Sequence, residues 1–158
     1  MSEPHVRILG DGSCELLTWL DYATLEDVTV RWESAADLAG DWLIETRAGT
    51  PGPAFSFLWS ACHQPLDGIV SVLVALANAA GDDEDMLGGL GAGWLEDLIP
   101  IAGKVPHLLD ELERAARQKP TIRAALGTVW MGADVPPDVR QRFRKYGARD
   151  VTADGSPS

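Results

Sequence analysis

The feature that most constrains the fold is a helical recurrence of apolar residues that begins at Ser34 and is repeatedly interrupted by proline and glycine. Within each interval, apolar residues recur three and four positions apart, as on the buried face of an α-helix. We therefore predict a mainly α fold, a compact bundle of about six or seven helices over residues 34–147. Their expected starts lie near Ser34, Phe55, Pro65, Trp94, Pro106, Pro120 and Pro136-Pro137.

Local signals predict where these helices end and which faces they bury. Ser34 is expected to cap the first helix, which residues 49–53 (GTPGP) terminate. The next helix carries apolar residues at 55, 58, 59 and 62, the spacing of one buried stripe. Residues 66–80 are apolar nearly all round, which predicts a central helix, and residues 120–130 are predicted to be helical throughout.

The two ends of the chain are expected to differ from this bundle. Residues 1–33 are predicted to form a short β-containing or irregular cap on the same domain, with strands at 6–9 and 28–32. Between these strands, residues 16–23 fit a short helix about as well as a strand. Residues 148–158 are predicted to be a disordered tail.

The composition is that of one globular domain. Of 158 residues, 46% are hydrophobic and 23% charged, enough apolar material for a core without disulfides. Cys14 and Cys62 lie among apolar residues and are expected to be buried thiols in a reducing compartment. No signal peptide is visible, and the longest apolar run is too short to cross a bilayer. The expected location is the cytoplasm.

The charge distribution is uneven. Residues 1–113 contain four basic and twenty acidic residues, a balance of −16, whereas residues 114–158 contain nine basic and four acidic residues, a balance of +5. An acidic surface repels phosphates, which disfavours nucleic-acid binding, and speeds the encounter with a basic protein. The alternative is that the acidic surface only keeps the protein soluble.

Three segments together resemble a known family. Residues 90–99 (LGAGWLEDLI) are followed by residues 109–116 (LDELERAA) and then by residues 120–130 (PTIRAALGTVW). This order resembles an uncharacterised bacterial helical domain family, a domain of unknown function. The resemblance covers about residues 34–130 and leaves the arginine-rich last helix outside. It implies a small helical fold with no catalytic residue or cofactor to transfer.

The adjacent acids Glu96 and Asp97 are the first candidate site. On a helix, neighbouring side chains point about 100° apart, so the two cannot form a facing acid–base pair. We favour a structural role, in which one of them binds a backbone donor or Arg123. Contact with a partner protein and catalysis remain the alternatives.

The acidic run Asp82, Asp83, Glu84 and Asp85 is the second candidate site. It is predicted to be an exposed connection with enough oxygen atoms for a divalent cation, but it lacks the alternating spacing of a calcium-binding loop. We therefore predict no metal and no cofactor. Together with Glu96 and Asp97, these four acids are the predicted contacts to a partner protein.

Three further motifs favour packing over chemistry. Cys62 and His63 diverge on a helix, and a zinc site needs more ligands. The glycines of residues 88–93 lack the Lys-Ser/Thr of a phosphate-binding loop, so tight turns and close helix approach explain them better. The last helix combines aromatic and basic residues, which suits nucleic acid, an acidic neighbouring face or a second copy: Arg140, Arg142, Phe143, Arg144, Lys145 and Tyr146.

The sequence contains six tryptophans, and any that are exposed would mark a binding surface. Taken together, these observations predict a non-enzymatic acidic module that binds another protein, such as an immunity or inhibitor protein against a basic partner like a nuclease toxin. One alternative is a small enzyme with a carboxylate or Cys/His site between helices. Another is a structural subunit of a homo-oligomer, with Phe143 and Tyr146 in a homodimer interface.

Overall fold

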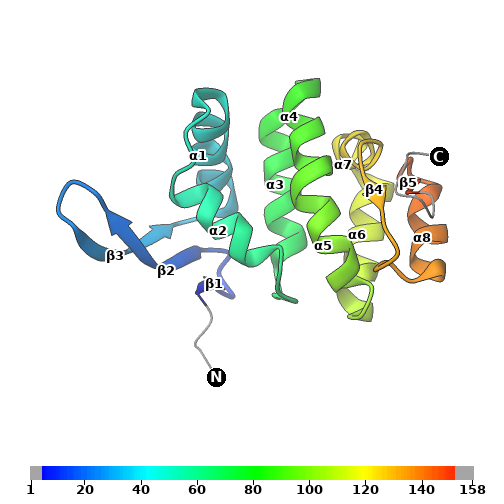
Figure 1. Cartoon of the computed structure of the whole chain (residues 1–158), viewed down its shortest axis with the longest axis horizontal. Helices are drawn as coiled ribbons and strands as arrows, with labels where there is room; N and C mark the ends of the chain where they lie inside the picture. Colours follow the sequence, from blue (N-terminus) through cyan, green and yellow to red (C-terminus); the bar gives the residue numbers. More distant parts are fainter. Residues whose placement is uncertain (1–4, 152–158) are drawn as a thin grey trace.

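The computed structural model describes residues 5–151 and is mainly helical, as predicted (Figure 1). The strands are β1 (Val6–Ile8), β2 (Cys14–Asp21), β3 (Glu26–Trp32), β4 (Trp130–Met131) and β5 (Arg149–Asp150). The helices are α1 (Ala35–Ala48), α2 (Pro53–Ala61), α3 (Ile69–Ala80), α4 (Glu84–Gly89), the π-helix η1 (Leu90–Leu95), α5 (Glu96–Ala102), α6 (Pro106–Gln118), α7 (Pro120–Leu126) and α8 (Pro137–Arg144). Because α4, η1 and α5 follow one another without a break, the described chain has seven separate helices.

The N-terminal strands form an antiparallel sheet in the order β1-β2-β3, which settles residues 16–23 in favour of a strand over most of their length. Side chains alternate between the two faces of β2, and Leu16 on the inner face is fully buried. The inner face packs on α2, where the rings of Trp32 and Phe57 meet edge to face at 5.6 Å. In Figure 1 the β2–β3 hairpin projects away from the helices.

The first helices begin and end close to the predicted residues, with one exception. The Ser34 hydroxyl accepts a hydrogen bond from the Asp37 N–H at 3.2 Å, and Gly49 ends α1 with a φ of 67°. Helix α3 does not begin after Pro65 as predicted, because Gly68 takes a φ of 89° and the helix starts beyond it. It lies between α1 and the α4–η1–α5 helix, the central place that its apolar sequence predicts (Figure 1).

The glycine-rich segment is helical, so the prediction of tight turns there is wrong. Helix α4 already begins at Glu84, and the glycines lie inside the continuous α4–η1–α5 helix. The close approach of helices is confirmed at Gly91, where a Cβ would lie 1.9 Å from the carbonyl oxygen of Ala125 and 2.1 Å from the hydroxyl of Thr128. A residue without a side chain is what allows η1 to contact α7.

The C-terminal region corrects two predictions. Helix α7 ends at Leu126, where the Thr128 hydroxyl donates to the Ala125 carbonyl, and the chain leaves as an extended segment. Strand β4 then pairs in parallel with β5, so residues 120–130 are not one helix. The strand β5 also lies where a disordered tail was predicted. Residues 152–158 of that predicted tail lie outside the described residues.

One connected core joins the sheet to the helices. Cys14 and Cys62 are both free and buried in it, as predicted. Within residues 5–151, no helix is long and apolar enough to cross a membrane.

Candidate binding groove

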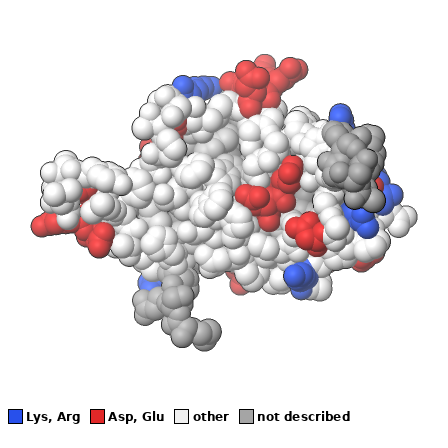
Figure 2. Space-filling model, in the orientation of Figure 1, with Lys and Arg blue, Asp and Glu red and all other residues white. Residues whose placement is uncertain are grey.

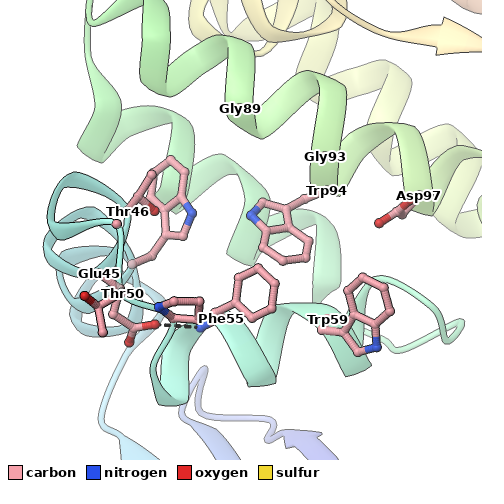
Figure 3. A pocket seen from close by; sticks show the side chains of 12 residues that line it. Glu45, Thr46, Thr50, Phe55, Trp59, Gly89, Gly93, Trp94 and Asp97 are labelled. Carbon is pink, nitrogen blue, oxygen red and sulfur yellow. Dashed lines mark hydrogen bonds between the residues drawn. The ribbon is translucent and has the colours of Figure 1, made fainter.

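A hollow of about 430 Å³ lies between the helices α1 and α2 on one side and the α4–η1–α5 helix on the other (Figure 3). Helix α1 contributes Trp42, helix α2 contributes Phe55 and Trp59, and η1 contributes Trp94. The turn after α1, residues 49–51, closes one end. We call this hollow the aromatic groove.

The groove exists because α2 carries apolar side chains on two faces. Phe57 and Leu58 point into the core and are fully buried, whereas Phe55 and Trp59 are 40% and 57% exposed. The ring of Phe55 packs edge to face on Trp94 at 5.3 Å and is stacked with Trp59 at 6.4 Å. The predicted single buried stripe at 55, 58, 59 and 62 is therefore wrong at 55 and 59.

Two glycines on the opposite side leave the groove open. Gly89 and Gly93 are four residues apart on the α4–η1–α5 helix, and both line the groove. A Cβ added at either position would meet no atom within 4 Å. These glycines thus differ from Gly91, which contacts α7.

Of the two carboxylates that line the groove, Glu45 is used by the fold. It accepts hydrogen bonds from the backbone N–H groups of Gly52, Ala54 and Phe55 at 2.7–3.0 Å. These are the free donors at the start of α2, which lacks a capping side chain of its own. The hydrogen bonds of the Glu45 carboxylate therefore join α1 to α2.

Asp97 is the second carboxylate, and its side chain is 37% exposed. Among the described residues its closest polar partner is His63, whose Nε2 lies 3.6 Å from Asp97 Oδ2, beyond hydrogen-bond distance. The His63 ring packs on Trp59 with centroids 4.9 Å apart, and its Nδ1 lies 2.6 Å from the Trp59 carbonyl oxygen. In Figure 3, Asp97 lies across the groove from Trp59 at one end, Glu45 lies at the other end, and Trp94 lies between the two ends.

The adjacent acids Glu96 and Asp97, predicted as one candidate site, have different partners in the structure. Glu96 Oε2 accepts a hydrogen bond from the backbone N–H of Trp130 at 3.0 Å, so this carboxylate holds strand β4 against α5. The expected bond to a backbone donor is thus found at Glu96. Arg123 contacts neither acid and donates instead to the carbonyl oxygens at the end of α6.

The predicted acidic run does not line the groove. Asp83 caps α4 by accepting a hydrogen bond from the Met86 N–H at 3.2 Å, and it lies 3.6 Å from Arg47. Asp82, Glu84 and Asp85 are exposed, the last two in the first turn of α4. Within residues 5–151, no group of three or more Asp, Glu, His or Cys side chains could hold a metal ion.

The basic C-terminal helix is held by acids of its own chain. Glu113 of α6 is buried and binds both Nε and Nη2 of Arg142, Lys145 Nζ at 3.0 Å and the Tyr146 hydroxyl at 3.2 Å. Burial alone raises the pKa of Glu113, but the hydrogen bonds from Arg142 and Lys145 outweigh it and lower the pKa to about 2. Phe143 is fully buried and cannot contact a second copy, whereas Tyr146 is partly exposed, so a homodimer through Tyr146 stays a prediction.

Cys62 and His63 do not form a reactive pair. Cys62 is buried, and burial raises the pKa of its thiol, with Asp97 adding to the shift. A protonated buried thiol is a poor nucleophile and a poor metal ligand. His63 is directed instead toward Trp59 and Asp97.

Sequence reasoning missed the groove, although a signal for it was present. Residues 54, 57, 58 and 61 of α2 show the same spacing as residues 55, 58, 59 and 62. A short helix with two apolar stripes against one core leaves one stripe partly exposed. All six tryptophans lie within residues 5–151, and of these only Trp59, on that second stripe, is exposed, whereas the others are buried or partly buried.

Comparison with known proteins places the chain in a family. No curated protein and no solved structure matches it. The model of a family of unknown function, DUF6869, matches residues 56–151, which include α8 and begin within α2, so the extent of 34–130 expected from the resemblance was wrong at both ends. Trp59, Trp94 and Asp97 of the groove lie inside this match. Because more than half of the chain matches, the protein belongs to the DUF6869 family of unknown function.

Proposed function

We propose that the protein acts by binding another protein and that the aromatic groove is the contact surface. The observation that carries this proposal is the exposure of Trp59, 57%, on the wall of a hollow lined by three further aromatic rings. Tryptophan is enriched among the few residues that dominate the binding energy of interfaces, and these residues cluster in pockets. The groove is preformed, because packing and capping hold its walls before any partner arrives.

The lining suits a polypeptide segment better than a small molecule. A site for a metabolite encloses most of its ligand, whereas this hollow is a groove whose wall leaves Trp59 57% exposed. Here Glu45 is saturated by backbone donors, which leaves Asp97 as the free acid of the lining. The indole N–H groups of Trp42 and Trp94 make no hydrogen bond to the described residues, so they are free to donate to backbone carbonyl groups of a bound segment.

The charges favour a basic partner. No lysine or arginine of the described residues lines the groove. Figure 2 shows acidic side chains in several groups on this face, whereas basic side chains gather mainly at the end of the molecule formed by α8. An immunity or inhibitor protein that covers a basic enzyme is one form of this function. A small enzyme is less favoured, since Glu96 is bound by a backbone donor and Cys62 is buried.

The test uses the tagged chain as bait in lysate of its source organism, at low and high salt. Gly93→Leu fills the groove at a position with open space, and Ala92→Leu adds the same bulk one residue away, on the exposed side of the same helix. We expect a protein that is retained by the wild type and by Ala92→Leu, lost with Gly93→Leu, and weakened by salt. Equal retention by Gly93→Leu and the wild type, with both variants folded by circular dichroism, would overturn the proposal.

A further inference from the structure

The end of the groove formed by Trp59 and Asp97 combines an exposed aromatic surface with a carboxylate that the fold does not use. Asp97 makes no hydrogen bond within residues 5–151 and keeps 37% of its side chain exposed. Trp59, on the facing wall, is exposed by 57%. Figure 3 shows the Asp97 carboxylate directed toward the space between Trp59 and Trp94.

The orientation of the His63 ring leaves Asp97 without a hydrogen-bond donor when this imidazole is neutral. The Trp59 carbonyl oxygen can only accept, so the Nδ1 that lies 2.6 Å from it carries the proton and donates. In the neutral imidazole, Nε2 then holds a lone pair, and this atom is the one that lies 3.6 Å from Asp97 Oδ2. Two acceptors, a carboxylate oxygen and an imidazole nitrogen, therefore lie side by side. A cation with more than one N–H group would satisfy both.

We infer that this end of the groove binds the guanidinium group of an arginine side chain from the partner protein, an inference that rests on the proposed function. The guanidinium donates to Asp97, reaches the His63 Nε2 with another N–H, and lies against the indole of Trp59. Its planar group stacks on aromatic faces, and its N–H groups match the two oxygens of a carboxylate. The apolar stem of the arginine then passes over Phe55 into the groove.

Lysine fits this arrangement less well. Its ammonium is a compact, strongly hydrated charge, which loses more hydration on entering an apolar groove and has no plane to stack on an indole. A neutral side chain of the same shape leaves Asp97 without a counter-charge. The site is therefore expected to rank arginine above lysine and both above a neutral isostere.

The test uses small probes, so that it does not depend on finding the natural partner. N-acetyl-arginine-N-methylamide is titrated into the ¹⁵N-labelled full chain, and the six indole N–H signals are followed by NMR after assignment by single Trp→Phe variants. The lysine and citrulline analogues are titrated in the same way, the latter being a neutral isostere of arginine. Asp97→Asn removes the charge at the site, and Asp82→Asn removes one exposed charge outside the groove.

We expect saturable shifts of the Trp59 and Trp94 signals with the arginine probe, several-fold weaker binding of the lysine probe, and no saturable shift with citrulline. Asp97→Asn is expected to weaken arginine binding at least tenfold, whereas Asp82→Asn changes it less than twofold. Equal binding by Asp97→Asn, or no shift in the wild type, overturns the arginine site. If the capture experiment still gives a partner that Gly93→Leu loses, the groove remains a protein-binding surface and only the arginine inference fails.

Discussion

The close contact at Gly91 allows a sharp test of how the groove wall is held in place. Gly91→Ala would put a Cβ 1.9 Å from the Ala125 carbonyl oxygen, a backbone atom that has no rotamer by which to move away. Ordinary contact begins near 3.4 Å, so η1 and α7 have to separate by more than 1 Å. Overpacking of this kind costs about 3 kcal/mol, the upper part of its usual range, because backbone has to move.

Gly93→Ala is the matched control, since it makes the same substitution in the same π-helix at a position with open space. Replacing glycine by alanine in a helix stabilises it by about 1 kcal/mol. The net expectation is therefore a loss of about 2 kcal/mol for Gly91→Ala and a gain of up to about 1 kcal/mol for Gly93→Ala.

Urea unfolding followed by circular dichroism measures both variants. For a chain of this size, a loss of about 2 kcal/mol also lowers the melting temperature by roughly 4–8 °C. The dependence of unfolding free energy on urea concentration should stay the same, as expected if the native fold is kept. The reasoning is refuted if Gly91→Ala is as stable as Gly93→Ala.

Three further predictions concern single side chains. The pKa of Glu113 is lowered from 4.5 to about 2, so its contribution, on the order of 3 kcal/mol, is present above pH 4.5 and lost as the pH falls toward 2. Acid titration of unfolding should show this loss in the wild type and not in Glu113→Gln. Glu96→Ala leaves the Trp130 N–H without its partner and should cost about 1–2 kcal/mol in urea unfolding, whereas an unchanged midpoint would exclude a structural role. Burial raises the pKa of Cys14 to about 11 and that of Cys62 further, so both thiols should react with a disulfide reagent only as fast as the chain opens. Rapid labelling of the native protein would contradict this.

Most helix positions were predictable for two reasons. The residues that face the core are apolar and recur at helical spacing, and proline and glycine interrupt this spacing between helices. Pro106 and Pro120 open helices where expected, since their missing N–H is not needed at the first position. The segment 88–93 was not predictable, because glycine in a sequence indicates a turn as readily as a close helix contact. Which of the two applies depends on α7, a helix about thirty residues later that packs against Gly91.

Helix α2 has two apolar stripes with the same spacing, and its own sequence does not determine which of them faces the core. The groove depends on which stripe is buried. The core takes the stripe with Phe57 because the Trp32 ring of the sheet packs against it. Trp59 is then left on the outer stripe, where His63 and Phe55 support its ring. The exposed tryptophan is thus a consequence of how a sheet and a helix far apart in the sequence meet.

Several of the acidic residues have a role within the fold. An excess of acidic residues indicates a basic partner only where their carboxylates are not already bound by groups of the same chain. Glu45 and Glu96 bind backbone donors, and Glu113 binds Arg142 of α8 and Lys145 just after it, so these three carboxylates hold elements together. Asp97 makes no hydrogen bond within the described chain, and it lines the aromatic groove together with the exposed Trp59. The proposal of a cationic partner therefore rests less on the balance of −16 than on this one carboxylate and the aromatic surface beside it.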